Sequence, residues 1–249
     1  MLTSFFTSNF FSRPWHLRKS EEKSVHPLLA QSREYFSNLE LDRPLHDYEF
    51  VVLDTELTGL KIKKDEMVSI GAVRIREMRI DVKDSFYNCV CPSMEVPKQS
   101  VLIHGITPSQ ASKAPPLEEV IRKFLEYCGN SVIIGHNIKL DMGVINRTLK
   151  RHFNGSLHNI CVDTMLLAIA CHEKTLSGSF EAFDTQESYN LKYLSQKYNL
   201  PLFQEHNAFS DALQAAYLFL FLVHKLQEAS TWTLKDLCRV GCSRSWALT

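Results

Sequence analysis

The sequence lacks long apolar runs and an excess of charge of either sign. No stretch of its 249 residues approaches the length of a membrane span, so we expect no membrane partner. Lys plus Arg and Asp plus Glu both number 28, and the formal net charge is zero. This balance argues against a protein that coats long nucleic acids, because such affinity comes from neutralising many phosphates. It leaves open an enzyme that grips a strand end with the help of bound cations.

The sequence also lacks Cys-x-x-Cys pairs, which argues against a tetrahedral zinc site. Its seven cysteines are scattered, and we expect free thiols in a cytoplasmic protein, with Cys238 and Cys242 unpaired as well. The first 20 residues lack acidic side chains, as transit peptides do, but Pro14 interrupts them and their first half has no basic residue. We therefore expect residues 1–47 to form an N-terminal arm, with a possible helix around 27–39.

A change of pattern at Glu49 marks the start of a folded domain, which we place at residues 48–228, followed by a C-terminal tail at 229–249. Apolar or alternating runs predict strands at residues 50–53, 67–76 (half-solvated), 85–90, 131–134 and 160–162. Apolar stripes predict helices at residues 117–127, 142–153, from 165, 191–198 and 208–226, with loops at 103–107 and about 175–188. Three antiparallel strands followed by alternating helices and strands predict an α/β fold, a mixed sheet with helices on both faces.

Two acidic residues, Asp54 and Glu56, directly follow the first predicted strand. In an extended segment, residues 54 and 56 point the same way, so their carboxylates converge on one side. Two like charges this close cost free energy unless a cation shares them. Taken alone, the pair fits a cation site and a solvated strand end equally well.

Three further polar residues stand at the ends of predicted elements. Asp141 lies where a strand passes into a helix, so it could be a metal ligand or a helix N-cap. Asp211 falls in the first turn of the last long helix and His206 on the loop before it; the alternatives are a favourable helix-dipole position and a surface loop histidine. Together, the four carboxylates and one histidine form an oxygen-rich set suited to Mg²⁺ or Mn²⁺.

The order of these motifs is specific. Asp-x-Glu at 54–56, His-Asn-x-x-Leu-Asp at 136–141 and His-x-x-x-x-Asp at 206–211 resemble the DEDDh (DnaQ-like) 3′→5′ exonuclease superfamily. The pattern is most similar to the proofreading epsilon subunit of bacterial DNA polymerase III and its stand-alone relatives. His-Gly-Ile-Thr at 104–107 and Val-Asp-Thr at 162–164 are also similar to that family's pattern. The resemblance implies a ribonuclease-H-like fold.

The resemblance also implies roles for the site residues. Asp54, Glu56, Asp141 and Asp211 would hold two divalent cations, Mg²⁺ or Mn²⁺. One cation would orient and acidify the attacking water, and the other would stabilise the leaving 3′-oxygen. His206 would be the general base. The products would be nucleoside 5′-monophosphates.

Substrate contacts are likewise implied by position. They are the backbone of Leu57, Thr58 and Gly59, together with Leu60, Ile103, His104 and Asn137. Leu60 and the Ile103–His104 edge would bracket the terminal base, a sequence-tolerant mode of recognition. Asp163 is interpreted as structural, a cap for the helix from Met165. Two departures from the family pattern, Leu57 in place of Thr and Leu140 in place of an aromatic residue, bear on substrate preference rather than on chemistry.

Three functions are open on this evidence. The first is a 3′→5′ exonuclease on single-stranded or frayed DNA ends, in replication proofreading or repair. The second is the same chemistry on RNA or short oligonucleotides, which side-chain placement around the 2′-hydroxyl would decide. The third is a DNA polymerase subunit with little activity that binds its partner through the N-terminal arm and residues 232–249 of the tail. The complete set of ligands favours an enzyme, and DNA is favoured over RNA.

Overall fold

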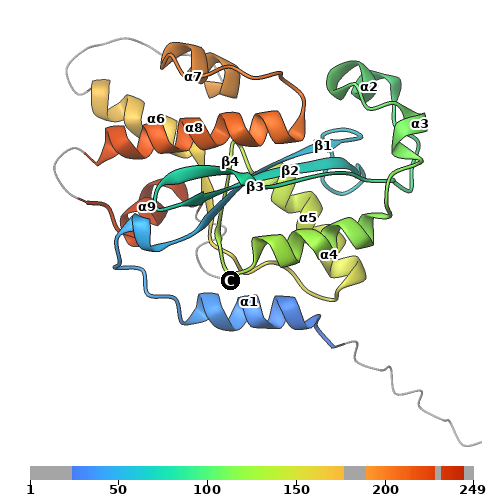
Figure 1. Ribbon diagram of the computed structural model, residues 1–249, viewed down its shortest axis with the longest axis horizontal. Coiled ribbons are helices and arrows are strands. Elements are labelled where there is room, and N and C mark those ends of the chain that lie inside the picture. Colours follow the sequence, from blue (N-terminus) through green and yellow to red (C-terminus); the bar gives the residue numbers. More distant parts are fainter. Residues whose placement is uncertain (1–23, 177–188, 228–230, 244–249) are drawn as a thin grey trace, which may run out of the picture.

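The computed structural model describes residues 24–176, 189–227 and 231–243 (Figure 1). A five-stranded sheet in the order β3-β2-β1-β4-β5 runs through the middle of the molecule. β1 (Phe50–Leu57), β2 (Met67–Arg76) and β3 (Arg79–Cys89) form an antiparallel meander. β4 (Val132–Gly135) and β5 (Cys161–Asp163) continue the sheet parallel to β1. The predicted mixed α/β sheet is confirmed.

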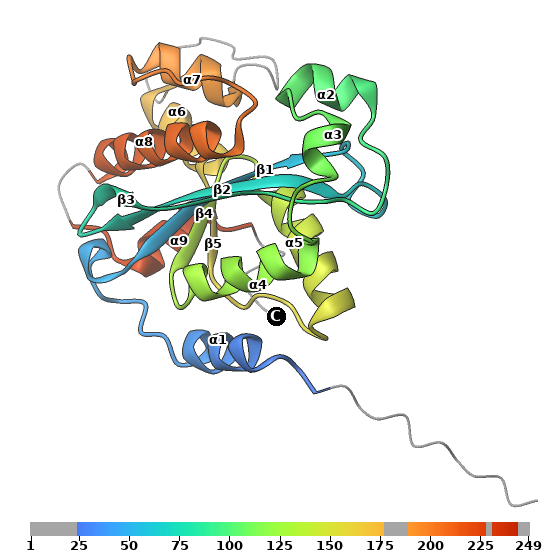
Figure 2. The same ribbon diagram turned by 45° about the vertical axis from the view of Figure 1, so that its right-hand side comes forward.

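Helices cover both faces of this sheet, as Figures 1 and 2 show. One face carries α1 (Pro27–Ser37), α4 (Leu117–Cys128) and α5 (Lys139–His152). The other carries α6 (Thr164–Leu176), α7 (Leu191–Lys197), α8 (Ala208–Leu226) and α9 (Leu234–Gly241). The short helices α2 (Lys98–His104) and α3 (Pro108–Ala111) follow β3, and a 3₁₀ turn (Leu45–Asp47) precedes β1.

Two hydrophobic cores lie against the two faces of β1. Val51 and Leu53 belong to the core under α4 and α5, whereas Phe50 and Val52 belong to the core under α8. The ring of Phe50 lies 5.4 Å from that of Phe219 in α8. Because alternate residues of a strand point to opposite faces, a central strand covered on both sides is apolar throughout. Packing on both faces fixes the position of β1 in the fold.

Several predicted boundaries of strands and helices were wrong. β1 continues to Leu57, so the two acidic residues predicted after the strand lie inside it. The predicted loop at 103–107 begins inside α2, which ends at Gly105 in the left-handed region (φ 73°). α5 begins at Lys139, earlier than predicted. The bounds of β2 and α8 are confirmed.

The prediction that β2 is half-solvated was also wrong. Arg74 is buried, and its guanidinium donates hydrogen bonds to Asp84 (2.8 Å) and to the hydroxyl of Ser131 (2.7 Å). A buried charge is tolerated when it is paired and hydrogen-bonded. The alternation of charged and apolar residues therefore reflected this ion pair rather than contact with water.

Both segments that flank the predicted domain contain helices that pack on it. Leu29 of α1 is buried in the core under α4 and α5, in a helix within the predicted range 27–39. Leu234 and Leu237 of α9 are fully buried in the core under α8. The predicted loop at about 175–188 lies mostly outside the described residues, as do residues 1–23. All seven cysteines are free thiols, as predicted, and no helix in the described ranges is long and apolar enough to cross a membrane.

Candidate active site

The centre of the site is a group of three carboxylates from two elements. Asp54 and Glu56 point to the same side of β1, and Asp211 comes from the first turn of α8. Each offers an oxygen atom that lies within 4.8 Å of the others. Gly71, paired with Asp54 across β1 and β2, makes this approach possible, because a Cβ there would lie 2.2 Å from the backbone nitrogen of Phe209. Only glycine lets the start of α8 lie on the sheet at this point.

Asp141 completes the acidic set from α5, beside the group of three rather than within it. Its Oδ1 accepts hydrogen bonds from the backbone N–H of Thr55 (3.0 Å) and from the Thr55 hydroxyl (2.5 Å). The N-cap position of α5 is Ile138, so the alternative interpretation of Asp141 as a helix cap was wrong. Asp141 is buried, and its carboxylate is oriented by Thr55, the residue between Asp54 and Glu56.

Burial is the largest cause that raises the pKa values of all four carboxyl groups. Burial, followed by Asp211 and Asp141, raises the pKa of Glu56 to about 7. Burial raises the pKa values of Asp141 and Asp211 to about 6, and burial with the other three carboxylates raises that of Asp54 well above its usual range. No ion pair joins any of them to a lysine or arginine of the described residues. Crowded, buried or half-buried carboxylates without a lysine or arginine partner fit hard divalent cations, which prefer oxygen ligands.

His206 lies at the rim of this acidic group, on the loop that leads into α8. Its side chain is exposed, its backbone is in the left-handed region (φ 59°), and Asn207 caps the helix that follows. A backbone hydrogen bond from His206 to Asp211 partly opposes the rise in the pKa of that carboxyl caused by burial. Burial, and then the nearby His206, lowers the pKa of His104. The structure thus brings the predicted base close to the predicted ligands.

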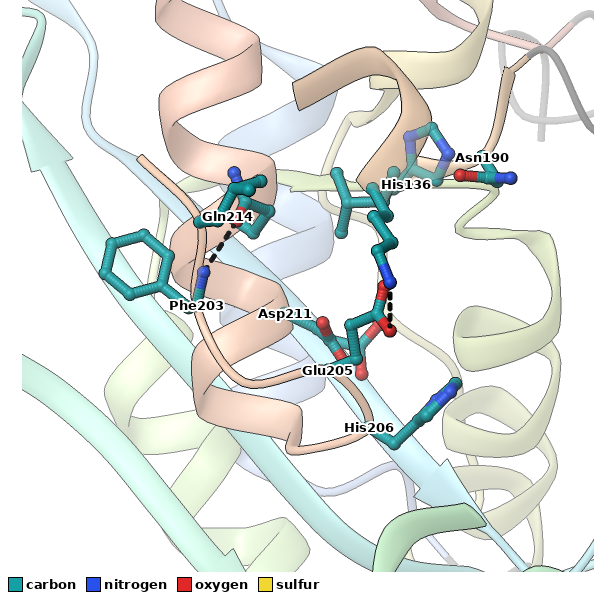
Figure 3. Close-up of a pocket in the computed structure, with 11 residues that line it drawn as sticks. His136, Asn190, Phe203, Glu205, His206, Asp211 and Gln214 are labelled. Atoms are coloured by element: carbon teal, nitrogen blue, oxygen red, sulfur yellow. Dashed lines mark hydrogen bonds and ion pairs between the residues drawn. The ribbon is translucent and has the colours of Figure 1, made fainter. Parts of the chain in front are cut away.

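A pocket of about 570 Å³ opens beside the carboxylates, between α7, α8 and the loop that joins them (Figure 3). It is lined by Asp54, His136, Asn190, Leu191, Lys192, Leu202, Phe203, Glu205, His206, Asp211 and Gln214. Most of these residues belong to no predicted motif. Gln214 was the one available signal, since it interrupts the apolar run of α8; it is buried, donates to the Pro201 carbonyl (2.7 Å) and accepts from the Phe203 N–H (3.1 Å).

The predicted substrate contacts at the end of β1 and after it differ in how far they are exposed to solvent. Thr58 is buried, its N–H donates to the carbonyl of Glu66 (2.8 Å), and its own carbonyl accepts from Ser100 (2.8 Å). A Cβ at Gly59 would lie 2.5 Å from a carboxylate oxygen of Asp65, so this glycine accommodates the protein's own side chain. Leu57 is buried at the strand end, whereas Leu60 is 82% exposed.

The other predicted contacts lie on α2 and before α5. Ile103 is exposed, while the ring of His104 accepts a hydrogen bond from Ile106 N–H (3.0 Å) through Nδ1. Asn137 has a left-handed backbone (φ 53°), and its N–H donates to Asp163 (2.8 Å). Asp163 accepts a second hydrogen bond from the Met165 N–H (2.9 Å), which confirms its interpretation as a structural cap of α6.

Comparison with known proteins identifies the family of this chain. Residues 51–219 match the RNase_T family model, described as Exonuclease. The DNA polymerase III PolC-type of Thermotoga petrophila is 28% identical over 231 residues, 90% of this chain and 16% of that protein. The corresponding protein of Caldanaerobacter subterraneus is 31% identical over 196 residues, 79% of this chain and 13% of that protein. The chain therefore spans only a small part of the length of these relatives.

Two solved structures share the fold. Escherichia coli Exonuclease I, in complex with a dT13 oligonucleotide, has a TM-score of 0.60 at 16% identity, over 73% of this chain and 46% of that one. Exonuclease X, in complex with 5′ overhanging duplex DNA, has a TM-score of 0.55 at 21% identity, over 77% of this chain and 98% of that one.

Proposed function

Because the chain belongs to the RNase_T exonuclease family, we propose that it is a divalent-metal-dependent 3′→5′ exonuclease that releases nucleoside 5′-monophosphates from DNA ends. The observation that carries this proposal is the group formed by Asp54, Glu56 and Asp211, with ligand oxygens within 4.8 Å of one another. The two similar structures were solved with a single-stranded oligonucleotide and with overhanging duplex DNA, which favours DNA with a single-stranded end.

In the proposed mechanism, Asp54, Glu56 and Asp211, together with Asp141, would hold the metal ions. Bound Mg²⁺ or Mn²⁺, two ions per site, would supply the charge that activates a water molecule and stabilises the leaving 3′-oxygen. Thr55 orients the carboxylate of Asp141 through its two hydrogen bonds. His206 accepts a proton from the attacking water at a ring nitrogen, a role that suits an imidazole on an exposed loop beside Asp211.

Binding of the terminal nucleotide would use the exposed side chains of Leu60 and Ile103, with His104 beside them. Apolar contacts of this kind grip any base face, so we expect little sequence preference. The backbone of Thr58 already makes hydrogen bonds within the protein, so we assign it a role in holding the loop that carries Leu60.

The test is to offer the purified protein DNA and RNA single strands labelled at either end, with Mg²⁺ or Mn²⁺. We expect the release of mononucleotides from 3′ ends, abolished by EDTA and by Asp54→Asn, and greatly reduced by His206→Ala. Persistent activity in EDTA or in Asp54→Asn would disprove the metal mechanism, and release from 5′ ends would disprove the polarity. If RNA is degraded faster than DNA, the enzyme is an exoribonuclease instead.

Association with a DNA polymerase is a second proposal, favoured by the PolC-type relatives, in which the matching segment is part of a polymerase chain by name. In that case α1 and α9, which flank the family match, provide surfaces outside the site. A binding subunit with little activity would bind 3′ ends without releasing mononucleotides, and the assay above distinguishes it from an enzyme.

A further inference from the structure

The pocket beside the carboxylates has one basic side chain that no motif accounts for. Lys192, in the first turn of α7, is the only lysine or arginine among the described residues that line the pocket. The neighbouring charged residues Asp54, Glu205 and Asp211 are acidic. His136 adds no charge near neutral pH, because burial lowers its pKa to about 4. Among the described residues, a polyanionic strand that enters this pocket therefore meets one lysine and no arginine.

The start of α7 is firmly anchored, so the position of Lys192 is well defined. The side chain of Asn190 accepts a hydrogen bond from the Tyr193 N–H (2.7 Å) and caps the helix. The carbonyl of Tyr189 is 2.8 Å from Nε2 of His136, which directly follows β4. α7 is thus tied to the end of a central strand, and it presents Lys192 towards the pocket from a rigid support.

In this state, Lys192 is paired with Glu205. Its Nζ lies 3.1 Å from Oε2 of Glu205, an ion pair drawn as a dashed line at Glu205 in Figure 3. The two side chains are 55% and 42% exposed. Ion pairs this exposed to water contribute little to stability, so another anion can replace Glu205 at small cost. A phosphodiester group has the charge and the oxygen acceptors to do so.

Glu205 lines the pocket together with the proposed metal ligands Asp54 and Asp211. It pairs with Lys192, and it also adds, after burial, to the rise in the pKa of Asp211. Lys192 therefore reaches the same pocket as Asp54 and Asp211, with Glu205 as its partner. A phosphate bound by Lys192 would be a neighbour of the scissile phosphate, since the metal ligands surround the scissile one.

We infer that Lys192 binds a non-scissile phosphate of the nucleic-acid strand, which takes the place of Glu205 as its partner. This inference rests on the proposed function and specifies its substrate class: chains with more than one phosphodiester. Lys192 becomes a specificity-determining residue for oligonucleotides over single phosphodiesters, and Glu205 is its competitor in the absence of substrate.

The test compares two substrates: a short oligothymidylate, and the 4-nitrophenyl ester of thymidine 5′-monophosphate, which has only the scissile phosphodiester. The measured quantity is the ratio of kcat/KM for the oligonucleotide to kcat/KM for the ester. In Lys192→Met we expect this ratio to fall about tenfold, the usual effect of one charge-assisted hydrogen bond. In Glu205→Gln we expect the ratio to rise, because Lys192 no longer has to break an ion pair before it binds the phosphate.

Lys235→Met is the matched control. Lys235 of α9 forms an ion pair with Asp42 at the same distance, 3.1 Å, and its loss should leave the ratio unchanged. A second readout is the salt dependence of kcat/KM for the oligonucleotide. Loss of one phosphate contact should reduce the slope of its logarithm against the logarithm of salt concentration by about 0.7 in Lys192→Met. A purely structural role for the ion pair would not change this slope.

Two outcomes would overturn the inference. If Lys192→Met and Glu205→Gln lower kcat/KM for both substrates equally, the pair only holds the loop that carries His206. If the ratio and the salt slope of Lys192→Met equal those of the wild type, Lys192 binds no phosphate. Failure of the wild-type protein to cleave either substrate would instead reject the proposed function itself.

Discussion

Thr55 and Asp141, 86 positions apart in the chain, are joined by two hydrogen bonds to one carboxylate oxygen. Thr55 lies between Asp54 and Glu56 on β1 and points to the opposite side from them, towards α5. β1 therefore provides two proposed metal ligands, Asp54 and Glu56, on one face. On its other face, Thr55 orients a third proposed ligand, Asp141. The geometry of the site depends on this strand more than on any loop.

Replacement of Thr55 by valine tests this relationship. Thr55→Val keeps the shape and the backbone N–H but removes the hydroxyl that donates to Asp141. We expect the apparent affinity for Mg²⁺ or Mn²⁺ to fall about tenfold, as is typical when a hydrogen-bond partner of a metal ligand is lost. A metal titration of activity measures it. Thr148→Val is the matched control, because the buried Thr148 hydroxyl donates to the carbonyl of Val144 within α5. An equal effect of both substitutions would contradict the prediction.

The raised pKa of Glu56 predicts how the metal-free protein responds to pH. Its value of about 7 in the folded state exceeds the ordinary 4.5, so the folded state holds the proton more tightly than the unfolded state. The contribution of Glu56 to stability is therefore fully present below pH 4.5 and is lost as the pH rises through 7. We expect Glu56→Gln to remove this loss, so that in EDTA at about pH 8 its free energy of unfolding exceeds that of the wild type by about 1–3 kcal/mol and it unfolds at a higher temperature.

Thermal unfolding with and without metal checks this prediction. Added Mg²⁺ or Mn²⁺ should stabilise the wild type by mass action and the variant much less, which reverses their order. Glu126→Gln, which removes an exposed partner of Arg122, should show neither effect. A lower unfolding temperature for metal-free Glu56→Gln at about pH 8 would show that the carboxylate is not repelled by its neighbours.

Much of the site could be predicted because its residues are tied to local patterns. The alternation of a strand places Asp54 and Glu56 together, and the first turn of a strongly apolar helix places Asp211. Their mutual approach required Gly71, whose role depends on the contact between β2 and the start of α8. Such a long-range contact leaves no local pattern. The same holds for Arg74, whose burial depends on partners distant in the chain.

Lys192 and α9 were missed for different reasons. The proposed role of Lys192 depends on its ion pair with Glu205 and on its place in the pocket. Both arise from the folding of segments that share no sequence motif. α9 did have a local signal: Thr233 and Asp236 form a capping box around Leu234, and Leu237 follows it, a pattern that marks the start of a helix. Its shortness hid it, since eight residues show barely two turns of periodicity.

Asp163 should behave as a structural residue. Asp163→Ala removes the acceptor for the Asn137 and Met165 N–H groups, so we expect a loss of about 1–2 kcal/mol in the free energy of unfolding, as for other helix caps. Chemical denaturation measures this loss. The metal concentration for half-maximal activity should stay close to the wild-type value; a large increase without loss of stability would make Asp163 a ligand instead.

The folded unit should need the segment that follows residue 228. Leu234 and Leu237 are fully buried under α8, and a β-bridge joins Thr233 to Pro44. A chain that ends at residue 228 exposes this part of the core, and we expect it to be unstable or insoluble. Leu237→Ala should cost about 2–5 kcal/mol by creating a cavity, whereas Lys235→Ala, on the exposed side of the same helix, should cost little. Cooperative unfolding of the truncated chain at the wild-type denaturant midpoint would show instead that residues 48–228 fold independently, with α9 as an accessory helix.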